Sequence, residues 1–300
     1  MTDFAPDLGL LLDVDGPIAS PVSRTVAIET IAPDLVTLAN AGVPIAFNTG
    51  RSDGFLREQL IPPLRAAGLA DDALVWGICE KGAVWMRITA HGEAELSVDE
   101  ELRMPPAFTR DIERLVDASY SDLVFFDHTK RAMVSVEQRT DVSNEEYLDR
   151  QGRFNADVAE VLERHDLGFE WEGERHPDAA GSVGYRIDPT IISTDIESNR
   201  VGKDLGASRM MQFLADEGVE APHRWRTMGD SRTDYAMADW LHDNGFEVAH
   251  VDVRPSDGVP EGKPYPIRQH SSLIHDESGA LYVRRWVEMV RGEAADDADV

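Results

Sequence analysis

Short apolar runs alternate with amphipathic stretches at the start of this chain. Three runs are almost wholly apolar, the pattern of strands buried on both faces of a parallel sheet: residues 8–14, 43–50 and 73–82. Between them, apolar side chains recur at helical spacing, predicting one helix from Asp34 and another over 54–69 that breaks at Pro62 and Pro63. This β-α-β-α-β order is typical of a doubly wound parallel sheet.

The rhythm changes in the middle of the chain, where helices and strands no longer alternate one for one. A hairpin is expected over 83–98, followed by helices over 108–121 and 144–165. Further strands are expected without a helix between each pair: 123–127, 131–138, 167–173, 182–188 and 191–198. We therefore predict an inserted α+β domain at residues 83–200.

The α/β rhythm returns after the insert. Helical and strand patterns follow one another again: helices at 203–218, 234–245 and 279–292, and strands at 224–230 and 246–253. The predicted fold is α/β, with a Rossmann-like doubly wound parallel sheet core formed by residues 1–82 and 201–292. Residues 293–300 are predicted to form a disordered acidic tail.

The charge of the chain limits its expected partners. Lys and Arg number 29 against 56 Asp and Glu, a formal net charge of −27. Such a surface repels nucleic acids and anionic membranes, so neither is expected as a partner. No apolar run has the length of a membrane-spanning helix, the first residues lack a signal-peptide pattern, and Cys79 is the only cysteine. A cytoplasmic protein without disulfides is therefore expected.

Polar residues stand where the predicted parallel strands end, which is where open α/β sheets bind ligands. They comprise four aspartates, one threonine and one lysine: Asp13, Asp15, Thr49, Lys203, Asp230 and Asp234. Several carboxylates in one crevice favour a divalent cation, and Mg²⁺ prefers oxygen ligands. A hydroxyl and an ammonium group can hold phosphate oxygens, and an aspartate can attack phosphorus. Taken singly, each residue also fits a turn, a helix cap or a solvated surface.

Five short motifs carry a resemblance to a known family: DVDGP from Asp13, NTGR from Asn48, ICEKGA from Ile78, VGKDLGA from Val201 and GDSRTDYAM from Gly229. In this order they resemble those of the haloacid dehalogenase-like hydrolase superfamily. The most similar branch consists of phosphatases with a large C2-type α/β cap inserted after the third strand (subfamily IIB, Cof-like and sugar-phosphatase-like). The resemblance spans residues 8 to about 253 and implies that the insert is such a cap.

The resemblance implies a role for each matching residue. Asp13 matches the nucleophile that receives the phosphoryl group, and Asp15 matches the acid/base that protonates the leaving oxygen. The implied Mg²⁺ ligands are Asp13, the backbone carbonyl of Asp15, and Asp230, with Asp234 supporting the site. The implied phosphate-binding groups are Thr49, the Gly50 amide and Lys203. The family's motifs usually have Thr, Asn and Asn at the positions of three departures, Pro17, Lys81 and Thr233.

The implied function is that of a Mg²⁺-dependent phosphatase. It would hydrolyse a small phosphorylated metabolite, such as a sugar phosphate, through an aspartyl-phosphate intermediate. One alternative is a phosphomutase with the same first half-reaction, and another is a non-catalytic protein that binds a phosphorylated metabolite. The oligomeric state is not indicated. Four cations are candidates for recognising the leaving group, with ordinary surface charge as the alternative: Lys81 and Arg186, which we favour, and Lys130 and Arg131.

Overall fold

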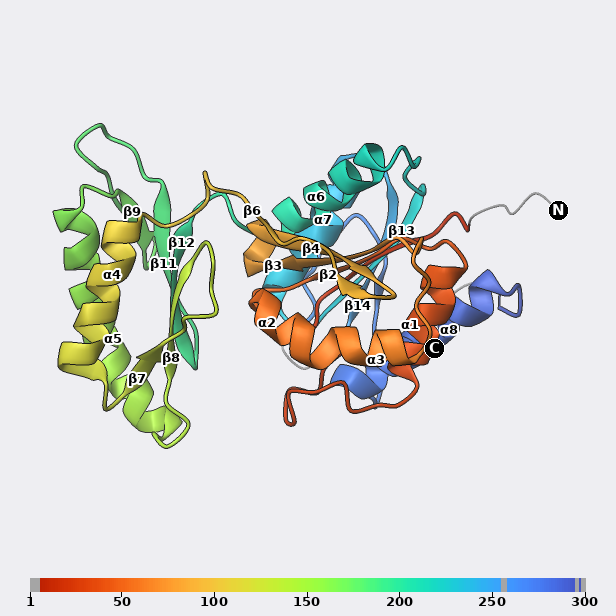
Figure 1. Ribbon diagram of the computed structural model, residues 1–300, viewed down its shortest axis with the longest axis horizontal. Coiled ribbons are helices and arrows are strands. Elements are labelled where there is room, and N and C mark those ends of the chain that lie inside the picture. The colour runs from red at the N-terminus through yellow and green to blue at the C-terminus, as the bar shows by residue number, and fades with distance from the viewer. Residues whose placement is uncertain (1–5, 255–257, 295–296, 298–300) are drawn as a thin grey trace. The chain divides into compact units, whose positions relative to one another are not determined.

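The computed structural model in Figure 1 describes residues 6–254, 258–294 and 297. It divides into two compact units. The core unit comprises Met1–Ser97 and Gly202–Val300, and the inserted unit comprises Val98–Val201. Among the described residues, no helix combines the length and the apolar character needed to cross a bilayer.

The core unit is built on a nine-stranded sheet in the order β15-β14-β13-β1-β2-β3-β4-β5, with β6 paired to β4. Its strands are β1 (Gly9–Leu12), β2 (Ile45–Asn48), β3 (Val75–Cys79), β4 (Val84–Thr89), β5 (Gly92–Glu93), β6 (Ser97–Val98), β13 (Arg224–Gly229), β14 (Glu247–Asp252) and β15 (Ile267–Arg268). From β15 to β3 all neighbours are parallel. The predicted α/β class with a doubly wound parallel sheet is confirmed.

Helices cover both faces of this sheet. They are α1 (Ile31–Asn40), α2 (Asp53–Phe55), α3 (Ile61–Ala66), α6 (Lys203–Asp216), α7 (Tyr235–Asp243) and α8 (His275–Val290). Helices α6 and α7 pack on one face, whereas α1, α3 and α8 lie on the other (Figure 1). The predicted break at Pro62 does not occur: α2, a π-helical turn (Leu56–Leu60) and α3 run on without interruption. Prolines 62 and 63 lack the N–H groups that an α-helical turn would use, and the π turn precedes them.

The register of the central strands brings their last residues to one edge. Leu12 of β1 lies opposite Met228 of β13 on one side and Phe47 of β2 on the other. The next residue of each strand is therefore Asp13, Gly229 or Asn48. Because the strands are parallel, the loops that follow them meet at this edge, where the candidate site lies.

The predicted hairpin forms, but it extends the core sheet instead of opening the insert. Strand β4 pairs antiparallel with β3, and β5 pairs with β4. Alternate residues of β4 are buried, and Trp85 packs near Phe213 of α6 with ring centroids 6.0 Å apart. Helix α6 thus covers the hairpin, and the inserted unit begins only at Val98.

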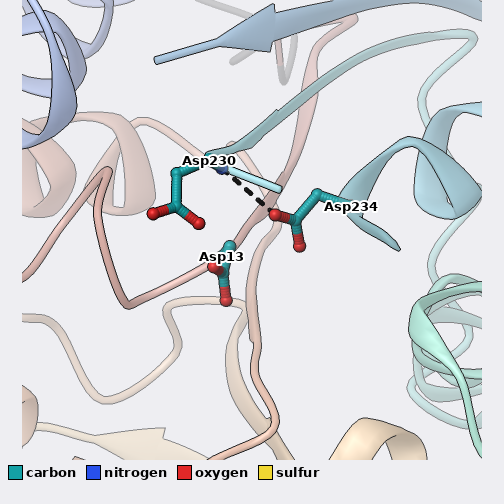
Figure 2. Close-up of side chains that lie close together, drawn as sticks. All are labelled: Asp13, Asp230 and Asp234. Carbon is teal, nitrogen blue, oxygen red and sulfur yellow. Dashed lines mark hydrogen bonds between the residues drawn. The ribbon is translucent and has the colours of Figure 1, made fainter. Parts of the chain in front are cut away.

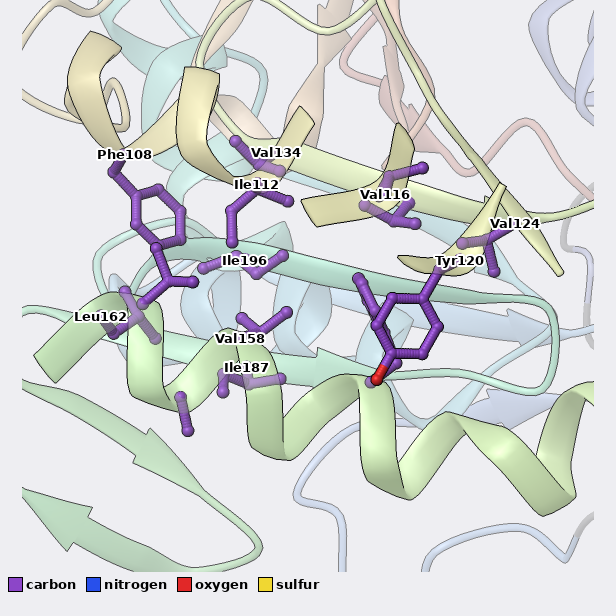
Figure 3. Packing of buried hydrophobic residues seen from close by; sticks show 14 of the residues in the cluster. Phe108, Ile112, Val116, Tyr120, Val124, Val134, Val158, Leu162, Ile187 and Ile196 are labelled. Carbon is purple, nitrogen blue, oxygen red and sulfur yellow. The ribbon is translucent and has the colours of Figure 1, made fainter. Parts of the chain in front are cut away.

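The inserted unit is a six-stranded sheet with two helices on one face (Figure 3). The strand order is β10-β9-β11-β12-β8-β7, with β7 (Val124–Phe126), β8 (Val134–Gln138), β9 (Phe169–Trp171), β10 (Glu174–His176), β11 (Tyr185–Pro189) and β12 (Ser193–Ser198). The helices are α4 (Pro106–Leu115), which continues as a π turn (Val116–Tyr120), and α5 (Asn144–Arg164). The buried side chains between the layers include Phe108, Ile112, Val158 and Ile196. The insert thus has a hydrophobic core of its own.

One residue of the predicted disordered tail is buried. Asp297 accepts hydrogen bonds from Arg226 Nε at 2.6 Å and from Trp286 Nε1 at 2.8 Å. Arg226 lies on β13 and is buried, so it needs a nearby counter-charge. The prediction of disorder is therefore wrong at Asp297, while residues 295–296 and 298–300 lie outside the described residues.

A buried histidine under the site makes folding stability sensitive to acid. His250 of β14 is fully buried, its Nδ1 shares a hydrogen bond with Thr227 Oγ1 at 2.7 Å, and its ring packs on Tyr235. Burial lowers the pKa of His250 to about 4. Between pH 6.5 and 4 the unfolded chain therefore protonates this ring whereas the folded chain does not. We expect the free energy of unfolding to fall across that window, by about 3 kcal/mol at most from this group.

The measurement is chemical denaturation at several pH values between 4 and 7. His250→Asn should depend less steeply on pH than the unaltered chain, although its stability at neutral pH can differ. His91→Asn is the matched control because His91 is exposed. Equal slopes for His250→Asn and the unaltered chain would contradict the prediction.

Candidate active site

Asp13 is a buried carboxylate at the end of a buried strand. Its backbone N–H donates to the carbonyl of Met228 at 2.8 Å, which fixes the residue directly after the last sheet pair. Asp13 is only 6% exposed. The apolar residues of β1 thus hold an acidic group at the sheet edge with little contact with water.

Lys203, the first residue of α6, meets three oxygen atoms. Its Nζ donates to Asp13 Oδ1 and to the carbonyl of Asn48, both at 2.7 Å, and forms an ion pair with Asp234 Oδ1 at 2.6 Å. Asn48 Nδ2 in turn donates to the carbonyl of Lys203 at 2.8 Å. Two of the three N–H donors of the ammonium group are therefore used in hydrogen bonds, and its charge is also paired with that of Asp234.

Asp234 is fixed by the turn that follows β13. Its Oδ2 accepts from the backbone N–H of Asp230 at 3.1 Å, the N–H of Ser231 at 3.0 Å and Ser231 Oγ at 2.8 Å. A side chain at Gly229 would place its Cβ 2.2 Å from Asp234 Cβ, so only glycine lets the strand end come this close. The Gly-Asp step of the motif is therefore explained by packing as well as by charge.

Asp13, Asp230 and Asp234 form an acidic cluster (Figure 2). One carboxylate oxygen from each lies within 4.8 Å of the others. Burial, and then the charge of Asp234, raise the pKa of Asp13 well above its usual value and that of Asp230 to about 6. A set made only of oxygen donors fits a hard divalent cation, whose charge would relieve this repulsion. The three residues could thus hold a metal ion.

The charges around Lys203 decide which groups of the cluster stay ionised. Burial works against the ammonium form of Lys203, but Asp13 and Asp234 outweigh it and raise the pKa of this lysine. Burial also opposes ionisation of Asp234, yet Lys203 lowers the pKa of Asp234 below its usual value. Lys203 and Asp234 therefore form a stable ion pair, and Asp13 and Asp230 are the carboxylates left for a further cation.

Asp15 lies outside the acidic cluster and is bound by Arg51. Arg51 Nε donates to Asp15 Oδ2 at 2.9 Å, and one terminal nitrogen donates to Oδ1 at 2.9 Å, a two-pronged contact. The Arg51 guanidinium also lies 5.0 Å from the centre of the Phe55 ring. No role is predicted for Arg51 from the sequence, although its place directly after Gly50 was an available signal.

The segment around Thr49 connects the three loops of the site. Thr49 is buried, and its Oγ1 accepts from the backbone N–H of Arg51 at 3.1 Å. Its carbonyl accepts from Lys81 N at 3.0 Å, and the carbonyl of Lys81 accepts from Gly202 N at 2.8 Å. Lys81 adopts φ 54°, and its side chain runs beside Gly50, where an added Cβ would lie 3.8 Å from Lys81 Cε. Lys81 is thus placed next to the predicted phosphate-binding residues.

Helix α8 brings two further residues to the site that the sequence analysis missed. His275 Nδ1 lies 3.9 Å from Asp230 Oδ2, and its φ is +50°. Gly279 packs so closely on the loop after Asp15 that an added Cβ would lie 1.9 Å from the carbonyl of Pro17. The sequence predicted that this helix begins at residue 279, whereas α8 begins four residues earlier, at His275. The first turn of the helix was therefore not expected beside the site.

The predicted cations of the insert have local surroundings of their own. Arg186 Nε donates to Glu197 Oε1 at 2.9 Å, and a terminal nitrogen donates to the carbonyl of Val201 at 2.9 Å. Glu197 is fully buried, so this ion pair accounts for the arginine on β11 without a ligand. Lys130 and Arg131 line a hollow of about 330 Å³.

Comparison with known proteins gives matches to solved structures only. No family model matches the chain, and no curated protein matches it in sequence. The trehalose-6-phosphate phosphatase C-terminal domain of C. albicans matches over 96% of this chain and 93% of its own, with TM-score 0.58 and 14% identity. Trehalose-6-phosphate phosphatase of Aspergillus fumigatus matches over the same shares with TM-score 0.52 and 14% identity.

A third structure carries the family's own name. A haloacid dehalogenase-like hydrolase from Bacteroides thetaiotaomicron matches over 93% of this chain and 98% of its own, with TM-score 0.57 and 11% identity. Because each of these matches covers at least 93% of this chain, each includes both the core unit and the inserted unit. This chain therefore has the fold of the haloacid dehalogenase-like hydrolases, as its motifs predicted.

Proposed function

We propose that this chain is a Mg²⁺-dependent phosphatase that hydrolyses a small phosphorylated metabolite through an aspartyl-phosphate intermediate. The observation that carries the proposal is the Asp13 carboxylate, buried at the strand end, bound to Lys203 at 2.7 Å and clustered with Asp230. The phosphatases among the solved structures that it resembles support the same reaction class. Two of these act on a sugar phosphate according to their names, so a sugar phosphate is the proposed substrate class.

Asp13 is the proposed nucleophile. Lys203 binds one of its carboxylate oxygens, Oδ1, which helps to position the side chain for attack. In the first half-reaction an Asp13 oxygen forms a bond to phosphorus while the bond from phosphorus to the leaving oxygen breaks. In the second, water attacks the phosphorus, the bond to Asp13 breaks, and phosphate is released.

Asp15 is the proposed acid and base. It stands two residues after Asp13 and is partly exposed, as a group must be that exchanges protons with a leaving oxygen and with water. It would donate a proton to the leaving oxygen in the first half-reaction and take one from the attacking water in the second. Thr49, the Gly50 N–H and Lys203 are the proposed donors to the phosphoryl oxygens.

Asp13 and Asp230, with the Asp15 carbonyl, are the proposed Mg²⁺ ligands, and Asp234 supports the site through Lys203 and the turn. When bound there, Mg²⁺ would neutralise the repulsion between the nucleophile and an anionic phosphate. The cluster fits this ion because it offers oxygen donors only and because burial raises the pKa of Asp13 and Asp230 in its absence.

The inserted unit is the proposed cap, which would set specificity for the leaving group. Lys81 remains our favoured specificity residue because its side chain runs beside Gly50. Arg186 remains a candidate of lower rank, since Glu197 already matches its charge.

The proposal is tested by hydrolysis of a generic aryl phosphate by the full chain with Mg²⁺. Steady turnover is expected. No turnover, with phosphate still bound, would favour a non-catalytic binding protein, and activity that needs a bisphosphorylated activator would favour a mutase. A panel of phosphorylated metabolites would then rank sugar phosphates against other substrates.

Metal removal should abolish turnover, and added Mg²⁺ should restore it. Independently of activity, Mg²⁺ should raise the thermal unfolding temperature of the unaltered chain because it binds only the folded cluster. Asp230→Asn should lose most of this rise, whereas Glu95→Gln, at an exposed position of the core unit, should retain it. Full activity in excess chelator, or an unchanged Mg²⁺ response in Asp230→Asn, would rule out the proposed metal site.

A further inference from the structure

The ammonium group of Lys203, which is bound to the nucleophile Asp13, already has several partners within the protein. Lys203 is 8% exposed, donates hydrogen bonds to Asp13 and to the Asn48 carbonyl, and forms an ion pair with Asp234. A phosphate dianion that enters this acidic site needs a donor that can reach it without breaking such a network. Lys203 is buried and its charge is shared between Asp13 and Asp234, so a second and more exposed cation would add to what Lys203 can supply.

Arg51 is a cation at the same edge with a more exposed environment. Its side chain is 25% exposed and that of Asp15 is 34% exposed. Its backbone is fixed on both sides: the N–H of Arg51 donates to Thr49 Oγ1, and its carbonyl accepts from Glu80 N at 3.0 Å. The guanidinium therefore starts from a rigid segment that includes the predicted phosphate-binding Thr49 and Gly50.

The negative charge of Asp15 acts on the nucleophile Asp13. After burial and Asp234, Asp15 is among the groups that raise the pKa of Asp13, and it acts on Asp230 in the same sense. Asp15 and the guanidinium bound to it thus lie within electrostatic reach of the proposed point of attack. A ligand phosphate at Asp13 would meet the Asp15 carboxylate as a like charge and Arg51 as an opposite one.

The same pair conflicts with the role proposed for Asp15. Arg51 binds both carboxylate oxygens of Asp15. A carboxylate held in this way accepts hydrogen bonds and cannot at the same time give a proton to a leaving oxygen. The pair must therefore open during the proposed reaction.

We propose that Arg51 exchanges partners during the reaction. Its guanidinium group releases Asp15 and binds the phosphoryl group of the substrate. This inference rests on the proposed function. The guanidinium fork matches two phosphate oxygens as well as it matches a carboxylate, and phosphate carries the larger charge. The ion pair between Arg51 and Asp15 is partly exposed and therefore only weakly stabilising. A phosphate dianion can thus displace Asp15 from the Arg51 guanidinium. Substrate binding thereby releases the acid that its own leaving group requires.

The exchange predicts a definite coupling between the two residues in phosphate binding. The probe is inorganic phosphate, titrated calorimetrically into the full chain with Mg²⁺. Arg51→Gln should weaken phosphate binding by roughly tenfold or more, and Asp15→Asn should strengthen it several-fold by removing the competitor. In the Arg51→Gln background, Asp15→Asn should strengthen phosphate binding clearly less, because it then removes only a like charge and there is no guanidinium to release.

A control and a second variant keep the test decisive. Arg57→Gln removes an arginine six residues further along the chain that pairs with Asp53 at 2.9 Å, and it should leave phosphate binding unchanged. Arg51→Lys retains the charge without the fork, so it should weaken binding less than Arg51→Gln and tests the same coupling should the glutamine variant not fold.

The outcomes separate this inference from the proposed function. If the unaltered chain binds phosphate but Asp15→Asn strengthens binding equally with and without Arg51, the effect is simple charge repulsion and the exchange is wrong. Unchanged phosphate affinity in Arg51→Gln would also overturn it while leaving the phosphatase proposal intact. An unaltered chain that binds no phosphate would overturn both.

Discussion

Asp13→Asn is expected to abolish phosphate ester hydrolysis while the protein remains folded. The amide has nearly the shape of the carboxylate but lacks the anion that attacks phosphorus, so turnover should fall by at least about a thousandfold. The fold should persist because Lys203 keeps its ion pair with Asp234 and its contact with Asn48. Removing one of two carboxylates beside a buried ammonium also relieves repulsion between Asp13 and Asp234.

The measurement pairs aryl phosphate turnover with chemical denaturation of the same sample. Asp216→Asn, on an exposed position of α6, is the matched control and should match the unaltered chain in both. Loss of activity together with loss of structure would be uninformative about chemistry, so Asp13→Glu provides a second variant that keeps the charge but moves the oxygen. Near-normal turnover in Asp13→Asn would contradict covalent catalysis by this residue.

Asp297→Ala is expected to lower the free energy of unfolding by about 3 kcal/mol. Its carboxylate is the partner of Arg226 at 2.6 Å, and both side chains are buried. Removing one member of a buried pair leaves the other charge uncompensated, which is far more costly than losing an exposed pair. Trp286 would lose its acceptor as well.

The comparison that isolates this effect uses urea denaturation of three variants. Asp297→Ala should be the least stable, and Arg226→Met with Asp297→Leu should recover most of the loss because no charge remains buried. Glu293→Ala, nearby in sequence and exposed, should be close to neutral. A loss below about 1 kcal/mol for Asp297→Ala would show that water reaches Arg226 in the folded protein.

The sequence predicted those parts of the site whose positions follow directly from the ends of the strands. Asp13 and Asp230 could be brought together because parallel strands end at a common edge, and this needs only the apolar pattern of the strands. The contact between Arg51 and Asp15 could not be derived in this way. It depends on side-chain rotamers, and an arginine after a Thr-Gly step could equally have pointed to solvent.

The errors in the predicted fold have similar physical causes. Apolar and polar residues alternate over 84–93 in the same way whether the hairpin pairs with β3 or with strands of the insert. Its place is decided by contacts distant in sequence, such as that between Trp85 and Phe213 of α6. Asp297 stands among acidic residues whose composition is typical of disorder. The buried Arg226 that holds it lies far away in sequence, where no local pattern connects the two.

The order of strands in the core sheet has a consequence during protein synthesis. Strand β1 is wholly apolar, and its partner β13 pairs Trp225 with Gly9 across the whole length of the insert. At about 5–20 residues per second, β13 leaves the ribosome on the order of ten seconds or more after β1. The inserted unit is continuous in sequence and can fold in that interval, whereas β1 waits with one edge unpaired. Newly made chains are therefore most exposed to aggregation through β1, at the residues that later position the nucleophile.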